Sequence, residues 1–291
     1  MSKMAQAELI LDAKATLGEG PSWDERNGLL YWVDIEGKRL HTYETGSGKT
    51  SSVSFGQRIG AAVPRKSGGV VMAMQDGFYA YDPARGGLSF LGNPSGRKEE
   101  TRFNDGKCDA AGRFWAGTMS LTGKAGQGAL YCLETDLTIR TVIENVSCSN
   151  GLAWSPDNRT MYYIDSPTRK VVAYDYDLAS GQIANGRTVV EVTEKGAVPD
   201  GMTCDAEGMI WVALWGGFGI RRWNPATGEL LLKVEVPAEQ SSSCAFAGAE
   251  LNELYITSAR VGIAESDQPL AGGLFVYRAG IKGLPTFAFG G

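Results

Sequence analysis

Acidic or amide side chains stand next to glycine at several places along the chain, each time at the start of an apolar run. Carboxylate and amide oxygens without histidine or thiolate form a hard donor set, which suits Ca²⁺, Mg²⁺ or Mn²⁺; Zn²⁺ also accepts carboxylate oxygen. The alternative is structural, because Asn or Asp beside Gly is common turn chemistry. The four places with an oxygen donor are Glu19-Gly20, Asn104-Asp105-Gly106, Asn150-Gly151 and Asp200-Gly201.

Histidine and cysteine usage narrows the possible chemistry. His41 is the single histidine, and it lies in the strand-and-turn stretch "KRLHTYET", so we interpret it as an ordinary outer-strand residue. This argues against a Ser-His-Asp triad and against a multi-histidine zinc site. The chain has 5 cysteines, an odd number, and they are widely spaced, which argues against a disulfide framework. No C-x-x-C pair occurs in the sequence, which argues against a thiolate zinc site. A thiol nucleophile at Cys148 is disfavoured because no histidine partner lies near it in the sequence.

The elements that must position these residues follow an internal repeat. Six segments each contain an apolar strand, a polar turn rich in Asp, Asn or Gly, and an apolar or aromatic strand, which is typical of a β-hairpin. The second strands are spaced about 40 to 49 residues apart, the period of a propeller blade. No long segment shows a persistent helical period. The second strands are expected to begin near Leu30, Val70, Arg113, Met161, Met209 and Glu253.

We therefore predict an all-β fold, a six-bladed β-propeller in which residues 1–291 form a single domain. The stretch "AELILDAKAT" is expected to close the ring as an outer strand of the last blade. Aromatic residues of the second strands are expected to fill the spaces between blades. They are Trp32, Trp115, Tyr163 and Trp211.

The propeller geometry brings the acidic and amide residues together. The first strand of a blade lines the central channel, so the positions just before each first strand should form a ring around one mouth. Two carboxylates that converge there repel each other unless a cation lies between them, so we predict a divalent metal site. Ca²⁺ is the first choice, with Zn²⁺, Mn²⁺ or Mg²⁺ as alternatives. The ring positions are Glu19-Gly20, Ile59-Gly60, Asn104-Asp105-Gly106, Asn150-Gly151, Asp200-Gly201 and Ser242-Ser243.

The turns between second and third strands should form the rim of the same mouth. The longest of them, "SLTGKAGQG" around Ser120 to Gln127, is a candidate lid, with a solvated loop as the alternative. Trp215 is expected either to pack against a sugar ring or to lie between blades. The predicted rim turns are 35–37, 120–127, 166–169 and 216–217.

Composition limits the partners. The net charge is −5 and the basic residues are scattered, which argues against nucleic acid or an anionic membrane as the main partner. No apolar run approaches the ~20 residues of a membrane helix, and the first residues lack the long apolar core of a signal peptide. We expect a cytoplasmic protein that binds a small molecule. A monomer and a small homo-oligomer both remain possible.

Several longer motifs carry a resemblance. They are "LGEGPSW", "RFNDGKCDAAGRFWAGTM", "GALY", "SNGLAWS", "YYIDS", "YDYDLASGQI", "PDGMTCDAEG" and "WVALWGGFGIRRWNP", in an order that covers nearly the whole chain. With them the chain resembles the senescence-marker-protein (regucalcin)/gluconolactonase family of six-bladed propeller lactonases. The resemblance implies hydrolysis of a sugar lactone to its aldonic acid.

The resemblance also implies roles for individual residues. Glu19, Asn150 and Asp200 match the family's divalent-metal ligands, and Asp200 also matches the residue that transfers a proton. Arg102 and Asn104 match residues that hold the substrate. Some members carry a glutamate just after "AGTM" that touches the sugar. Here the sequence continues "SLTG" with no acid, so Thr122 or Ser120 is expected in its place.

Two other functions remain open. Related calcium propellers hydrolyse phosphotriesters on the same oxygen-ligand scaffold. A non-catalytic metal-binding propeller that uses its rim to bind partners is the third interpretation, and it predicts metal binding without turnover.

Overall fold

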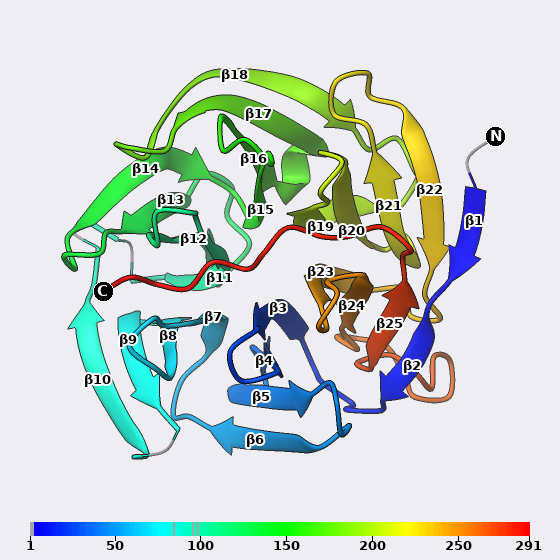
Figure 1. Ribbon diagram of the computed structural model, residues 1–291, viewed down its shortest axis with the longest axis horizontal. Helices are drawn as coiled ribbons and strands as arrows, with labels where there is room; N and C mark the ends of the chain where they lie inside the picture. Colours follow the sequence, from blue (N-terminus) through cyan, green and yellow to red (C-terminus); the bar gives the residue numbers. More distant parts are fainter. Residues whose placement is uncertain (1–2, 84, 95, 98) are drawn as a thin grey trace.

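The computed structural model describes residues 3–83, 85–94, 96–97 and 99–291, and within these residues the strands form six sheets around a central axis (Figure 1). In each sheet the first strand of the blade is innermost and the next strands follow outward in sequence order, except that the outermost strands of the last two sheets come from the N-terminus. The prediction of an all-β, six-bladed propeller is thereby confirmed. The inner strands are β3 (Gly18–Asp24), β7 (Ile59–Pro64), β11 (Thr101–Cys108), β15 (Ser149–Trp154), β19 (Val198–Cys204) and β23 (Ser241–Ala247).

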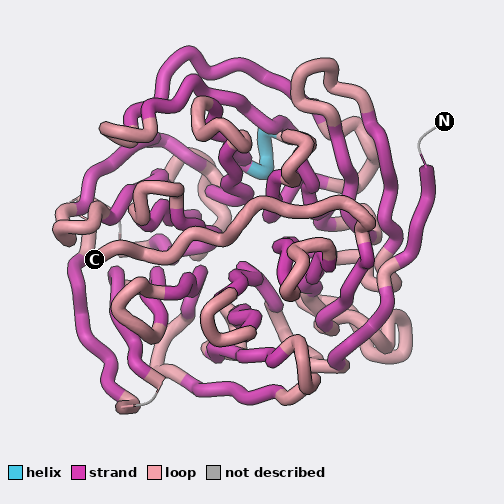
Figure 2. Tube along the Cα trace, in the orientation of Figure 1, coloured by secondary structure: helices cyan, strands magenta, loops and turns pink. Residues whose placement is uncertain are grey.

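Figure 2 shows the chain as strands and loops with one helical segment among the described residues, η1 (Ser166–Thr168). Blade 1 continues with β4 (Leu29–Asp34), β5 (Arg39–Glu44) and β6 (Thr50–Ser54), and blade 2 with β8 (Val70–Met74), β9 (Gly77–Asp82) and β10 (Gly87–Gly92). Blade 3 has β12 (Phe114–Ser120), β13 (Gly128–Leu133) and β14 (Ile139–Val146), and blade 4 has β16 (Thr160–Asp165), β17 (Lys170–Asp177) and β18 (Gln182–Glu191). Blade 5 has β20 (Ile210–Trp215), β21 (Gly219–Trp223) and β22 (Leu230–Glu235), and blade 6 has β24 (Glu253–Ser258) and β25 (Leu274–Arg278).

The N-terminal residues close the ring. Strand β2 (Glu8–Leu11) pairs antiparallel with β25 and completes blade 6, which confirms the expected outer strand. Strand β1 (Lys3–Gln6) pairs parallel with β22 and adds a fifth strand to blade 5, which we did not expect. The start of the chain therefore ties two neighbouring blades together.

The predicted ring residues lie inside the inner strands and not just before them. Every one of the six inner strands among the described residues has an irregularity in its pairing at this level. A β-bulge inserts a residue without ending the ladder and redirects the side chains beside it. The bulge thus explains why the strand continues through Glu19, Asn150 and Asp200. The shifts lie between Glu19 and Ser22, Ile59 and Ala61, Phe103 and Gly106, Asn150 and Leu152, Pro199 and Met202, and Ser241 and Ser243.

Glycines at the bulges allow neighbouring inner strands to approach each other. A Cβ on Gly60 would lie 2.5 Å from the carbonyl oxygen of Asn104, and a Cβ on Gly151 would lie 2.6 Å from that of Asp200. Both distances are shorter than real Cβ contacts, so only glycine fits. The close approach of backbones, predicted from the recurring glycines, is confirmed at these positions.

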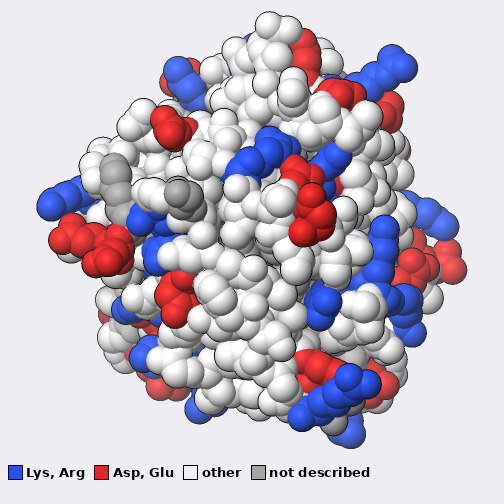
Figure 3. Space-filling model, turned by 90° about the vertical axis from the view of Figure 1, so that its left-hand side faces the viewer, with Lys and Arg blue, Asp and Glu red and all other residues white. Residues whose placement is uncertain are grey.

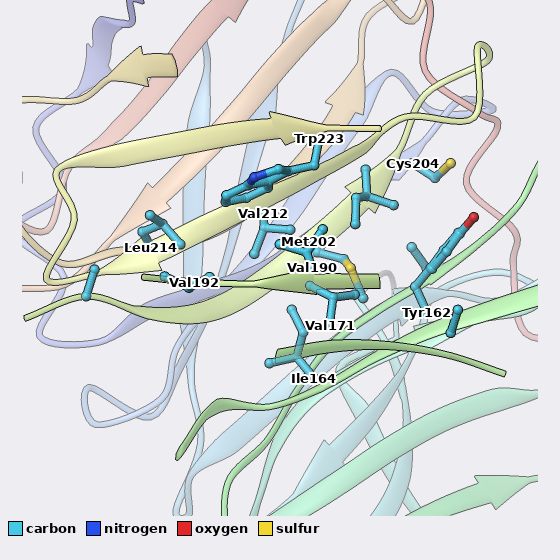
Figure 4. Close-up of a cluster of buried hydrophobic side chains, with 14 residues drawn as sticks. Tyr162, Ile164, Val171, Val190, Val192, Met202, Cys204, Val212, Leu214 and Trp223 are labelled. Carbon is cyan, nitrogen blue, oxygen red and sulfur yellow. The ribbon is translucent and has the colours of Figure 1, made fainter. Parts of the chain in front are cut away.

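Apolar side chains fill the spaces between neighbouring sheets. Figure 4 shows the cluster between blades 4 and 5, where Ile164 and Val171 meet Met202 and Val212. Trp115 of blade 3 packs edge-to-face on Trp154 of blade 4, with ring centroids 5.9 Å apart. The four aromatic residues predicted between blades are all buried, namely Trp32, Trp115, Tyr163 and Trp211.

The C-terminal segment crosses one face of the disc, seen as the red trace in Figure 1. It is held by backbone hydrogen bonds from Phe289 N to Pro64 O (2.8 Å) and from Ala206 N to Lys282 O (2.9 Å). A cavity of about 130 Å³ lies between residues 284–287 and the C-terminal ends of the inner strands, next to Cys108 and Cys204. The segment therefore covers the end of the channel opposite to the bulges.

Charges of both signs are interspersed on the face shown in Figure 3, in keeping with the scattered basic residues of the sequence. Among the described residues, no helix has the length and apolar character needed to cross a membrane.

Candidate active site

A cavity of about 640 Å³ lies at the mouth of the channel where the inner strands begin. Five predicted site residues from four blades line it, since the bulges place them at one level of the ring. They are Glu19, Arg102, Asn104, Asn150 and Asp200. The structure thus brings together all the predicted metal-binding and substrate-binding residues except Thr122.

Glu19, Asn150 and Asp200 are each only 4% exposed. Burial raises the pKa of Glu19 well above its ordinary value, and the charges of Asp200 and Asp105 raise it further. Burial likewise raises the pKa of Asp200, with the charge of Asp105 as the second cause. Ionised carboxylates in this place are unstable without a nearby positive charge. The charge of Arg102 lowers both pKa values but ranks below burial among the causes, so a divalent cation would further favour the ionised carboxylates.

Two oxygens in this group have no hydrogen-bond partner although they are fully buried. They are Oδ1 of Asn150 and Oδ1 of Asp200. Leaving a buried acceptor unpaired costs about 1–3 kcal/mol, more for a charged group. A divalent cation would satisfy both atoms, so these residues fit the implied metal. Among the described residues, no group of three or more His, Cys, Asp or Glu able to hold a metal occurs, and the proposed set combines two carboxylates with the amide of Asn150.

The orientation of the Asn150 amide is set by a neighbour. Its Nδ2 donates to the hydroxyl of Ser166 at 2.9 Å, which leaves Oδ1 as the free atom. Ser166 is itself buried and is the first residue of η1, and its backbone N–H donates to the carbonyl of Cys148 at 3.1 Å. Sequence analysis assigned Ser166 only to a rim turn, because nothing local in the sequence links it to Asn150.

Asn104 has a different role from Asn150. Its Oδ1 accepts a 2.6 Å hydrogen bond from Nη1 of Arg102, and its Nδ2 donates to the carbonyl of Ser149 at 2.9 Å. One acceptor position of the Asn104 oxygen is therefore occupied, whereas the side-chain oxygen of Asn150 has no partner among the described residues. The structure favours Asn104 as a partner of Arg102, whereas composition alone had left it among four candidate oxygen donors. Burial lowers the pKa of Arg102.

The longest rim loop reaches the cavity only at its start. Ser120 and Leu121 line the cavity, whereas Thr122 is exposed and does not. The hydroxyls of Ser120 and Thr122 lie 3.1 Å apart, and the backbone N–H of Thr122 donates to Ser120 Oγ. Substrate contact by Thr122 stays a prediction, and Ser120 is the better placed of the two.

Two charged residues of the cavity wall were not predicted as site residues. Glu36 lies in a predicted rim turn, and Arg58 directly precedes the ring position Ile59-Gly60, so its place in the repeat was a usable signal. Trp215 is half-buried and packs against a cluster that includes Leu17, as expected for a residue between blades. It also lines the cavity, and its contact with a sugar ring stays a prediction.

His41 and Cys148 show no nucleophilic arrangement. His41 lies on β5, stacked on Trp32 with ring centroids 4.0 Å apart, and burial lowers its pKa to about 4. It does not line the cavity. Cys148 does line it, but burial raises the pKa of its thiol to about 12, and its Sγ lies 3.6 Å from Sδ of Met119.

Carboxylates at the ends of the second strands hold the backbone that enters the site. Asp34 accepts hydrogen bonds from the N–H groups of Thr16, Leu17 and Gly37 at 2.8–3.0 Å. Asp165 accepts from Ser147 (3.1 Å) and Cys148 (2.8 Å) in the same way. These bonds fix the approach to Glu19 and to Asn150.

Known proteins share this arrangement of strands. The family model described as SMP-30/Gluconolactonase/LRE-like region matches residues 17–260. The protein named "Putative sugar lactone lactonase YvrE" of Bacillus subtilis (strain 168) is 40% identical over 288 residues, covering 98% of this chain and 99% of that protein. Regucalcin of Danio rerio is 39% identical over 292 residues, with coverage of 98% and 99%. The crystal structure of a calcium-binding protein, regucalcin from Agrobacterium tumefaciens str. C58, superposes with a TM-score of 0.94 at 25% identity, covering 99% of both chains.

Proposed function

The chain belongs to the SMP-30/gluconolactonase/LRE-like family, and we propose that it is a metal-dependent hydrolase that opens a sugar lactone to the aldonic acid. The observation that carries the proposal is the pair of buried, unpartnered oxygens on Asn150 and Asp200 at the wall of a large open cavity. The similarity to a protein named as a sugar lactone lactonase supports the substrate class. A cavity of about 640 Å³ is in the usual size range of small-molecule sites.

Glu19, Asn150 and Asp200 are the residues that would hold the cation. Their oxygens suit a hard divalent ion, and we propose Ca²⁺, in agreement with the calcium-binding description of the Agrobacterium relative. When bound, such an ion supplies a Lewis acid for the lactone carbonyl and its developing negative charge. Zn²⁺, Mn²⁺ and Mg²⁺ are alternatives that the assay below compares.

The chain's own groups supply the remaining steps. Asp200 lines the cavity beside the other proposed cation ligands, and its carboxylate accepts the proton of the attacking water. Arg102 directs its guanidinium into the cavity wall beside Asn104, where it binds the carbonyl or ring hydroxyls and limits the orientations of the lactone. No side chain is required as a nucleophile.

The test is an assay of gluconolactone and related sugar lactones after removal of metal by a chelator, with Ca²⁺, Zn²⁺, Mn²⁺ or Mg²⁺ added back singly. We expect no hydrolysis above background in the stripped protein and recovery with at least one ion. An aryl phosphotriester assayed in parallel should react far more slowly. Turnover in metal-free protein, or faster phosphotriester hydrolysis, would overturn the proposal. Metal binding without any turnover would support the non-catalytic alternative.

We also propose a cytoplasmic location. The five cysteines, all described, form no disulfide, which suits a reducing compartment.

A further inference from the structure

An ion pair between Glu36 and Arg58 forms part of the cavity wall. Nε of Arg58 lies 3.0 Å from both carboxylate oxygens of Glu36, and its Nη2 lies 2.9 Å from Oε2. Nη1 donates to Oε1 of Gln75 at 3.2 Å. The side chains of Arg58 and Glu36 are 29% and 33% exposed, so the pair is ordered by its partners but still open to a ligand.

Both side chains of the pair can form hydrogen bonds beyond those they form with each other and with Gln75. A guanidinium has five N–H donors. Three of them are directed to Glu36 and Gln75, which leaves two without a partner among the described residues. A carboxylate has about four lone-pair positions, so Glu36 can accept further hydrogen bonds while it is paired. Alternating donors and acceptors on one surface are what adjacent hydroxyl groups require.

The opposite charges of Glu36 and Arg58 also offset each other, so the pair has no net charge. Arg58 and Glu36 both influence the pKa of Arg102, in opposite directions, so they lie within electrostatic range of the substrate end of the site. The carboxylate of Glu36 would repel a carboxylate or phosphate on a ligand, and it offsets the attraction of Arg58 for such a group. Leu121 and Trp215 contribute apolar surface to the same cavity.

We infer that the Glu36–Arg58 pair binds the hydroxyl groups of a neutral, polyhydroxylated lactone and selects against lactones that carry a carboxylate or phosphate. The inference rests on the proposed lactonase function and adds the substrate class within it. Glu36 accepts from a hydroxyl and Arg58 donates to the same or the next one. The pair is thus a specificity determinant, since it contacts hydroxyl groups of the substrate and takes no part in the proton transfer assigned to Asp200.

The test compares Glu36→Gln and Arg58→Gln with the wild-type holoenzyme on three lactones: glucono-1,5-lactone, the unsubstituted δ-valerolactone and an aldarolactone. Glu36→Gln keeps an acceptor for Arg58 but removes the negative charge. We expect its KM for gluconolactone to rise about tenfold with kcat little changed, because a hydrogen bond to a charged group is lost. Its kcat/KM for the aldarolactone should rise, because Arg58 is no longer offset. Arg58→Gln should weaken gluconolactone binding without that gain, and δ-valerolactone should respond to neither.

Asp175→Asn is the matched control, because Asp175 forms an exposed ion pair with Arg187 (2.8 Å) on the outer strands of blade 4. Asp175→Asn should leave kcat/KM unchanged for all three lactones. Thermal melts should show that all variants fold. If the wild type opens no lactone, the proposed function itself fails. Two results with an active wild type would show that the inference about the pair is wrong. In the first, Glu36→Gln leaves the ratio of kcat/KM for gluconolactone to kcat/KM for the aldarolactone unchanged. In the second, it lowers kcat/KM for δ-valerolactone by the same factor as kcat/KM for gluconolactone.

Discussion

The amide of Asn150 donates to the hydroxyl of Ser166 at 2.9 Å, and this bond leaves the Asn150 carbonyl oxygen buried and free. Ser166, which also lines the cavity, thereby sets which atom of Asn150 faces the site. Partners of this kind are typically worth 10–100-fold in metal affinity or activity.

Replacing Ser166 with alanine should therefore weaken cation binding about 10–100-fold, since the amide is no longer held in one orientation. The measurement is a titration of Ca²⁺ against the chelator-stripped protein by calorimetry. Ser180→Ala is the control, because Ser180 has a similar side-chain hydrogen bond, to Asp177, on an exposed turn. Equal affinity in the two variants would contradict the role assigned to Ser166.

Asp200→Asn should abolish most of the lactone hydrolysis while the fold persists. Loss of a general base costs ~10²–10⁴-fold in rate, and loss of a metal ligand adds to this. The residue lies at a bulge of β19 on the cavity wall and supports little of the apolar core. The variant's kcat/KM and its circular dichroism spectrum check the two parts. Activity within a few fold of wild type would remove Asp200 from the mechanism.

The stability of the metal-free protein should fall as pH rises above the ordinary carboxyl range. The pKa values of Glu19 and Asp200 are raised in the folded state, so that state keeps protons that the unfolded chain has lost. Stability is then fully present below the unfolded pKa and lost as pH rises through the folded pKa. Saturating Ca²⁺ should remove the fall, because the ion stabilises the ionised carboxylates.

Urea unfolding at about pH 5 and about pH 8, with chelator and with Ca²⁺, measures this effect. His41 contributes with the opposite sign, since burial lowers its pKa to about 4 and the unfolded chain binds the proton more tightly. The contribution of His41 to the free energy of unfolding cancels when the metal-free and the Ca²⁺-loaded protein are compared at the same pH. A difference between the forms that does not grow with pH would argue against a shared cation at the carboxylates.

Cys148→Ser should retain more than about a third of the wild-type kcat, whereas loss of a true nucleophile costs orders of magnitude. Burial raises the pKa of the Cys148 thiol to about 12, so almost no thiolate exists at neutral pH. The measurement is the steady-state kcat for gluconolactone. A folded but inactive Cys148→Ser protein would indicate that the Cys148 thiol is the nucleophile after all.

Gly151→Ala should lower the free energy of unfolding by about 1–3 kcal/mol and reduce activity, because an added Cβ meets the carbonyl of Asp200 at 2.6 Å. Gly46→Ala is the matched control, since an added Cβ there has nothing within 4 Å. Denaturant melts of both variants compare the two sites. Equal stability would show that inner strands do not need the glycine.

The fold could be predicted because its signals are local and repeated. Turn residues between two apolar strands indicate each hairpin, as around Asn158 and Gly208. The period of the repeat, together with the length of the chain, gives the number of blades. The same repeat placed Glu19, Asn150 and Asp200 at equivalent positions, and the structure puts all three on one cavity. The fifth strand of blade 5 was missed, because its pairing joins Lys3–Gln6 to residues over 220 positions away.

What the sequence by itself determined was the type of fold, the spacing of the oxygen-bearing ring residues and the presence of a single histidine, His41. Only the tertiary structure distinguished Asn150 from Asn104, whose oxygen is used by Arg102, and only it paired Glu36 with Arg58 across two blades. The physical reason is that amide orientation and ion pairing depend on neighbours that folding supplies. Local spacing specifies where a side chain begins, whereas packing decides which of its atoms is left free.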